Sequence, residues 1–171
     1  MKKLATMTAL FLALAAPTTA LAENVAAMLT GWEEVPSVST VASGEFRATI
    51  SADEQSITYE LTYTGLQGTV TQAHIHIARR MANGSIVVWL CGTATNPGPT
   101  GTATCTEGSG TFTGTITSDN VVAGSIASQQ LTANDLAEVI AAIRANAAYA
   151  NVHTSLSTGG EIRGQIHRAM P

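Results

Sequence analysis

Short segments in which apolar and polar side chains alternate run through most of the chain. In residues 44–51 every second side chain is apolar, and residues 56–64 repeat this pattern after a turn at residues 52–55. Successive side chains of a strand point to opposite faces, so a period of two predicts an antiparallel hairpin with one apolar face. The apolar positions of the two segments are Phe46, Ala48, Ile50, Ile57, Tyr59, Leu61 and Tyr63.

Other segments of strand-like composition are separated by turns that contain Gly, Pro, Asn or Asp. They are residues 24–30, 68–78, 85–90, 110–117, 121–126, 149–154 and 160–167. Many short strands joined by turns are typical of all-β domains. We therefore expect a mainly antiparallel fold of about eight strands, either a β-sandwich or a Greek-key barrel.

One segment has the spacing of a helix. Thr132 offers a hydroxyl N-cap with Asp135 three residues later, a variant of the capping box. The apolar residues that follow at helical spacing are Leu136, Val139, Ile140 and Ile143. This pattern predicts one short amphipathic helix that ends near residue 146, before the C-terminal strands.

Residues 1–22 have the pattern of a cleavable signal peptide. Lys2 and Lys3 form a positive start, and the apolar run after them is too short to span a bilayer. Ala20 and Ala22 then supply an A-x-A cleavage signal. We expect cleavage after Ala22, one domain over residues 23–171, and a periplasmic or secreted location. No other segment is apolar enough to cross a membrane.

Loss of the signal peptide leaves an acidic domain of low charge density. It removes the only two lysines, so that six arginines face twelve acidic residues. An acidic surface without a basic cluster argues against nucleic acid or anionic lipid as a partner.

The two cysteines of the chain, Cys91 and Cys105, bracket a segment that contains Pro97-Gly98-Pro99. In an exported protein an isolated pair indicates a disulfide, which would stabilise the fold by about 3 kcal/mol in the chain-entropy model. The alternative is a pair of thiolates in a metal site, which requires a reducing compartment.

The four histidines suggest a shared site. His74 and His76 lie on the same face of a predicted strand, roughly 7 Å apart along the backbone, while Ala73 and Ile75 face the core. His153 and His167 lie in the last predicted strands. His167 again falls on the face opposite the apolar side chains, so we expect the histidines to face a common surface.

Three motifs in order resemble the CHRD domain, which is named for chordin, an extracellular regulator of bone morphogenetic proteins. They are Leu29-Thr-Gly-Trp-Glu-Glu-Val-Pro36, Ala73-His-Ile-His76, and Tyr149-x-Asn-Val-His-Thr154 followed by Gly160-Glu-Ile-Arg-Gly-Gln-Ile166. The resemblance covers the whole predicted mature chain. It implies an extracellular β-rich domain, of a family whose bacterial members mostly lack an assigned activity, and a possible extracellular protein partner.

A weaker resemblance is to copper-zinc superoxide dismutases, exported Greek-key barrels with a His-x-His strand. It implies that His74, His76 and His153 match copper ligands and that Arg163 matches the arginine that guides an anion to the metal. The bridging histidine, the zinc loop and a clear fourth copper ligand are missing from this sequence.

These patterns leave three interpretations of the histidines. The first is a copper or zinc site at His74, His76 and His153, with His167 and Glu161 as outer candidates. Arg163 is then a candidate anion guide, and Glu161 or Gln165 a candidate partner for an imidazole N–H. The second is a metal-free interaction module in which the histidines bond to loop backbone. The third is a copper oxidoreductase of dismutase type.

The absence of familiar catalytic motifs favours a protein without enzymatic activity. The sequence has no Gly-x-Ser-x-Gly elbow and no phosphate-binding loop. We interpret Glu33 and Glu34 as solvated acids of a turn.

Overall fold

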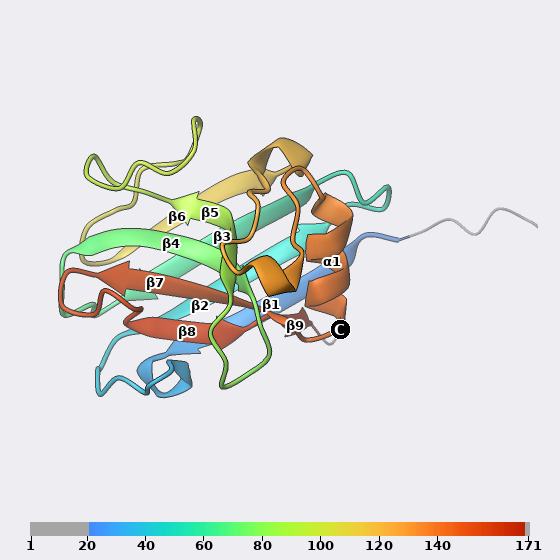
Figure 1. The fold of residues 1–171 in the computed structure, drawn as a ribbon. Helices are drawn as coiled ribbons and strands as arrows, with labels where there is room; N and C mark the ends of the chain where they lie inside the picture. The colour runs from blue at the N-terminus through green and yellow to red at the C-terminus, as the bar shows by residue number, and fades with distance from the viewer. Residues whose placement is uncertain (1–20, 170–171) are drawn as a thin grey trace, which may run out of the picture.

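The computed structural model describes residues 21–169. Its strands are β1 (Glu23–Thr30), β2 (Ser43–Ile50), β3 (Ile57–Thr64), β4 (Val70–Ile77), β5 (Ser85–Cys91), β6 (Gly110–Ile116), β7 (Ala148–Thr154), β8 (Ile162–Gln165) and β9 (His167–Arg168). They form one antiparallel sheet in the order β5-β4-β7-β8-β1-β2-β3-β6, with β9 paired to β1 (Figure 1). The predicted fold class is confirmed. The predicted signal peptide lies outside the described residues, except for Leu21 and Ala22.

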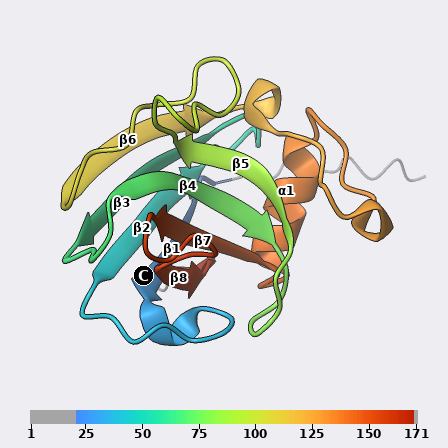
Figure 2. The ribbon, with the colours of Figure 1, turned by 60° about the vertical axis from the view of Figure 1, so that its left-hand side comes forward.

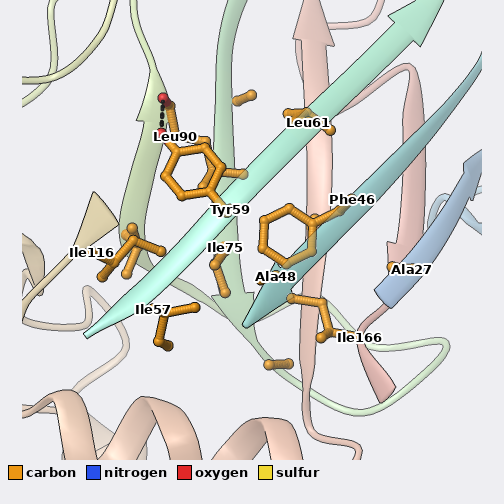
Figure 3. Packing of buried hydrophobic residues seen from close by; sticks show 14 of the residues in the cluster. Ala27, Phe46, Ala48, Ile57, Tyr59, Leu61, Ile75, Leu90, Ile116 and Ile166 are labelled. Atoms are coloured by element: carbon orange, nitrogen blue, oxygen red, sulfur yellow. Dashed lines mark hydrogen bonds between the residues drawn. The ribbon is translucent and has the colours of Figure 1, made fainter. Parts of the chain in front are cut away.

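The predicted hairpin is confirmed as β2 and β3, which pair over their full length from Ser43 with Thr64 to Ile50 with Ile57. Its apolar positions face the core, where Phe46 stacks on Tyr59 with ring centroids 6.0 Å apart (Figure 3). Ile75 of β4 and Ile166 at the C-terminal end join the same core.

The sheet curls into a nearly closed barrel in which the β5 edge approaches the β6 side (Figure 2). Three contacts close the gap. Val88 bridges Val121, the Tyr59 hydroxyl donates to the Leu90 carbonyl at 2.9 Å, and the predicted disulfide between Cys91 and Cys105 is confirmed. These contacts cover part of the β5 edge, where the Val87 carbonyl accepts from the Val122 amide at 2.9 Å.

The predicted strand over residues 121–126 is wrong, because its backbone pairs mainly within its own loop. The Gly124 amide donates to the Leu131 carbonyl, and the Val121 carbonyl accepts from Asn134. Only the single bridge to Val88 remains of the predicted strand. Short 3₁₀ turns occupy Ser118–Asn120 and Ala127–Gln129, and another follows β1 at Gly31–Glu33.

The predicted helix is α1 (Leu136–Arg144), which lies across one end of the barrel and buries its apolar side chains (Figure 1). Its N-cap is Asp135, whose carboxylate accepts from the Glu138 amide at 3.0 Å. The predicted cap at Thr132 is wrong, because Asn134 has a left-handed backbone with φ 63° that interrupts a helix there. No helix within residues 21–169 is long and apolar enough to span a membrane.

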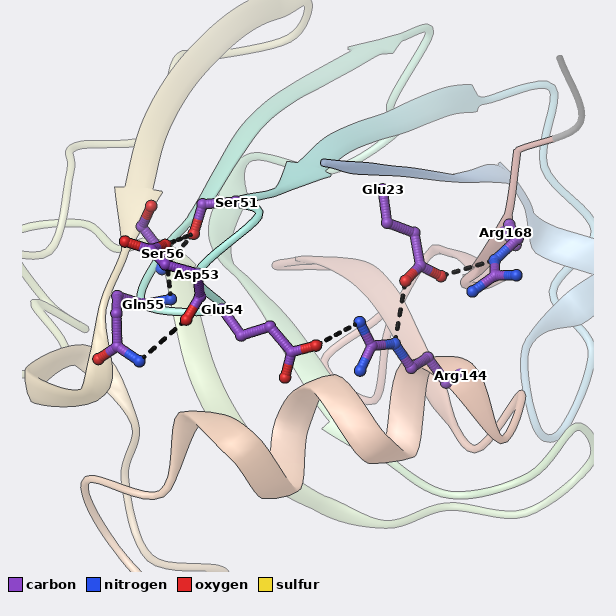
Figure 4. A network of polar contacts seen from close by, with 8 residues as sticks. All are labelled: Glu23, Ser51, Asp53, Glu54, Gln55, Ser56, Arg144 and Arg168. Atoms are coloured by element: carbon purple, nitrogen blue, oxygen red, sulfur yellow. Dashed lines mark hydrogen bonds and ion pairs between the residues drawn. The ribbon is translucent and has the colours of Figure 1, made fainter. Parts of the chain in front are cut away.

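An ionic network fastens the C-terminal end of α1 to the sheet (Figure 4). The Glu23 carboxylate accepts from Arg144 at 2.9 Å and from Arg168 at 2.7 Å. Arg144 also donates to Glu54 at 2.8 Å, so the helix, β1, β9 and the β2–β3 turn are held together.

Candidate metal centre

A polar layer lies on the face of β4, β7 and β8 that points away from the barrel core. Residues directly opposite each other on antiparallel strands project to the same face. The pairs are Gln72 with His153, His74 with Asn151, His76 with Tyr149, Asn151 with Arg163, and Tyr149 with Gln165. We call these eight residues the outer polar layer.

The three predicted histidines of this layer are buried instead of lying on an open surface. Relative exposure is 0% for His74, 7% for His76 and 6% for His153. Trp89 of β5 packs edge-on against His74, with ring centroids 4.3 Å apart. The pairing of β4 with β5 shifts register before His74 and again after Ile75, and such irregularities commonly re-aim side chains next to functional sites.

His74, His76 and His153 form a compact cluster in which one ring nitrogen from each lies within 4.8 Å of the others. His74 Nδ1 is 3.2 Å from His153 Nε2. The predicted convergence of these three histidines from two strands is therefore present in the structure.

The hydrogen bonds of the rings fix which nitrogens carry lone pairs. Nδ1 of His76 lies 3.0 Å from the Gly84 carbonyl, and Nδ1 of His153 lies 2.9 Å from the Thr158 carbonyl. A carbonyl only accepts, so both Nδ1 atoms are protonated and both Nε2 atoms carry lone pairs. His74 must then donate from Nδ1 to His153 Nε2, which leaves its own Nε2 unprotonated.

Two of these lone pairs are unused. Nε2 of His74 and Nε2 of His76 are buried and have no hydrogen-bond partner among residues 21–169. Nδ1–H groups that donate to backbone carbonyls, with Nε2 free, are the usual arrangement of metal-ligating histidines.

Burial also keeps the rings neutral. It lowers the pKa of His74 to about 2, aided by the neighbouring His153 and His76 rings, and lowers the pKa of His76 to about 4. Burial lowers the pKa of His153 as well. Neutral imidazole is the form that binds metal, so the cluster needs no deprotonation at pH 7.

The CHRD domain model matches residues 25–166. The chain belongs to the CHRD family. Searches of curated proteins and of solved structures find no match. The matched residues include all three clustered histidines, and the function of this CHRD domain must be argued from the site itself.

Arg163 lies beneath a loop of the CHRD domain instead of lining an open path to the histidines. It is 1% exposed, and its guanidinium lies over the Tyr149 ring at 3.4 Å. It donates to Asn83 Oδ1 and to the Arg79 and Ala82 carbonyls. Tyr149 in turn stacks on His76, with ring centroids 4.7 Å apart. The guanidinium therefore supports the loop and the aromatic stack.

Three other predicted site residues make their hydrogen bonds with groups outside the histidine cluster. Gln165 donates to the Ala78, Asn146 and Ala148 carbonyls. The Glu161 carboxylate accepts from Thr40, Gln67, Gly68 and Thr154. His167 is exposed on β9, and its Nδ1 lies near the Gln165 carbonyl. None of the three hydrogen-bonds to His74, His76 or His153 in the described residues.

The interpretation of Glu34 as a solvated acid of a turn is wrong, because its side chain is buried. It is 6% exposed, and Asn151 donates to its carboxylate over 3.5 Å. Burial raises the pKa of Glu34 to about 7, against the opposing effect of Asn151 and Arg163. Glu34 is buried because its carboxylate lies against Asn151 and Gly160, whereas Trp32 of the same turn is exposed.

Sequence reasoning missed Tyr149 and Asn151 as members of the site. The sequence did contain a signal for both residues. In the Tyr149-x-Asn-Val-His motif they stand four and two residues before His153, so a strand projects all three side chains to the same face. Glu34 gave no comparable signal, because its burial depends on contacts between segments far apart in the chain.

Proposed function

We propose that this CHRD domain is an exported metal-binding module that holds one copper ion through His74, His76 and His153, with zinc as the alternative ion. The observation that carries the proposal is the pair of buried, unpartnered Nε2 atoms of His74 and His76. A buried polar atom without a partner costs about 1–3 kcal/mol. A metal ion would satisfy both lone pairs at once.

The donor set favours copper or zinc over harder ions. Neutral imidazole suits both metals, and copper(II) binds nitrogen sites more tightly than the neighbouring divalent metals. Cys91 and Cys105 are joined in a disulfide and offer no thiolate. Metal bonds of about 2.0–2.1 Å place ligand atoms roughly 3–4 Å apart. The rings therefore have to close by about an ångström, and the hydrogen bond between His74 and His153 is exchanged for metal bonds.

The test is titration of the purified mature protein with copper(II) and zinc(II), by calorimetry and by competition with a chelator. His74→Ala and His153→Ala each remove one proposed ligand. His167→Ala is the matched control, because it removes an exposed histidine outside the cluster. We expect one metal per chain, loss of tight binding in the first two variants, and no change in the third.

Two results would contradict the proposal. One is the absence of tight binding by the wild-type protein. The other is binding that His74→Ala and His153→Ala leave unchanged while circular dichroism shows both variants folded. Either result would favour a metal-free interaction module, whose function lies in its protein partners.

A further inference from the structure

Asn151 is a buried amide with an unused oxygen beside the histidine cluster. It is 2% exposed, and its Oδ1 has no hydrogen-bond partner among residues 21–169. It lies directly opposite His74 in the pairing of β4 with β7, two residues along each strand from the pair of His76 with Tyr149. Directly opposed side chains on neighbouring strands have Cβ atoms about 4.5–5.5 Å apart.

Glu34 and Gly160 hold the orientation of this amide. Asn151 Nδ2 donates toward Glu34 Oε1 at 3.5 Å. A Cβ added at Gly160 would lie 2.4 Å from Asn151 Nδ2 and 2.3 Å from Glu34 Oε1, so the Gly160 backbone closes this side of the pair. The reversed amide would place its oxygen against the ionised Glu34 carboxylate, which repels it. Nδ2 therefore donates to Glu34, and Oδ1 is the amide atom without a hydrogen-bond partner.

Three buried lone-pair atoms thus share one face of two neighbouring strands. They are His74 Nε2, His76 Nε2 and Asn151 Oδ1, and no donor hydrogen from residues 21–169 reaches any of them. Buried acceptors without donors are unfavourable, and each requires a water or a cation. A water molecule has only two hydrogens to offer, whereas a cation can accept all three lone pairs.

We propose that Asn151 Oδ1 is a fourth donor to the metal held by His74, His76 and His153, with Glu34 as the positioning residue for its amide. The inference rests on the proposed function. An amide oxygen is a harder donor than imidazole, and oxygen ligands favour divalent ions over copper(I). Asn151 would therefore determine which oxidation state of copper the site prefers.

The test compares copper(II) and copper(I) affinities and the copper(II) electron paramagnetic resonance spectrum of the wild-type protein, Asn151→Leu and Asn151→Asp. We expect Asn151→Leu to bind copper(II) roughly tenfold or more weakly than the wild-type protein does. Its copper(I) affinity should match that of the wild-type protein, and its copper(II) spectrum should differ. Asn151→Asp should bind copper(II) more tightly, because a carboxylate is the stronger oxygen donor. Asn24→Leu is the matched control, since it makes the same substitution at an exposed position of β1, outside the outer polar layer.

The outcomes separate this inference from the proposed function. Asn151→Leu could keep the copper(II) affinity and spectrum of the wild-type protein while His76→Ala binds no copper(II). Asn151 is then no ligand, and the proposed three-histidine site stands. If Asn151→Leu does not fold, an Asn151→Asp protein with unchanged affinity and spectrum overturns the inference in the same way. If the wild-type protein binds no metal, the proposed function fails, and this inference fails with it.

Discussion

At the scale of single residues, removal from water shifts the pKa of Glu34 and the pKa values of the three clustered histidines in opposite directions. Burial disfavours the charged form of every group, so it raises the pKa of Glu34 and lowers the pKa of each clustered histidine. Both shifts favour the neutral forms of these side chains. Three neutral imidazoles suit a cation better than rings that already carry protons.

Glu34→Gln tests this account of burial. The folded-state pKa of about 7 lies above the ordinary value of 4.5, so the folded protein binds more protons than the unfolded chain between these pH values. The amount by which Glu34 lowers the free energy of unfolding therefore grows as pH rises through this window, and it reaches its full value above pH 7. Since glutamine is neutral throughout, the metal-free variant should gain stability over the wild-type protein on going from pH 5 to pH 8, by up to about 3 kcal/mol.

Urea unfolding of both proteins at the two pH values measures this gain. The histidines change stability in the opposite direction as pH falls, but they are common to both proteins and cancel in the difference. Glu33→Gln is the control, because Glu33 pairs with Arg80 at the surface. A gain that is the same at pH 5 and pH 8 would show that Glu34 titrates normally in the folded state.

At the scale of elements, the loops that cover the site are tied together by one buried carboxylate. Glu161 is 1% exposed and accepts from Thr40 and Thr154 at 2.8 Å each, and from the Gln67 amide at 2.8 Å. Burial alone would raise the pKa of Glu161, but these hydrogen bonds together hold it below its usual range. The loop after β1, the β3–β4 loop and the start of β8 therefore meet at this side chain.

Glu161→Gln should destabilise the fold by about 1–3 kcal/mol, because the new amide N–H meets donors where an acceptor is required. Chemical unfolding at pH 7 gives the value. Glu107→Gln, a matched change at an exposed loop position, should differ from the wild-type protein by less than about 0.5 kcal/mol. Equal stability of the two variants would mean that Glu161 does not hold the loops.

The elements that sequence predicts well are those with local signals. The alternation around Phe46 and Tyr59 specifies the β2–β3 hairpin, and the helical spacing from Leu136 to Ile143 specifies α1. The start of α1 and the segment after β6 were mispredicted, because a left-handed Asn134 and hydrogen bonds within a loop decide them. Neither feature has a periodic pattern.

At the scale of the whole molecule, strand parity predicts that His74 and His76 share a face, but neither that His153 joins them nor what covers them. His74, His76 and His153 share a face because β4 and β7 are neighbours, which the alternation within each strand does not specify. Their burial depends on loops around Glu34, Asn83 and Thr158, whose positions depend on contacts far apart in the chain. His167 has the same parity in sequence but pairs with β1, on a strand that does not border the cluster.

At the scale of the whole chain, we predict that the protein is exported and processed. We expect the signal peptide over residues 1–22 to be removed, so that the mature protein begins at Glu23, the first residue of β1. Intact-mass measurement of protein recovered from the periplasm or the medium should give the mass of residues 23–171. Recovery of the full-length chain only from the cytoplasm would contradict this prediction.

The claim that the three histidines hold one metal ion is tested most directly by anomalous diffraction at the copper edge from crystals of the copper-loaded protein. The account predicts one strong anomalous peak per chain, about 2.0–2.1 Å from ring nitrogens of His74, His76 and His153. Copper peaks only at exposed positions such as His167, with the cluster keeping the 3.2 Å contact between His74 and His153, would contradict it.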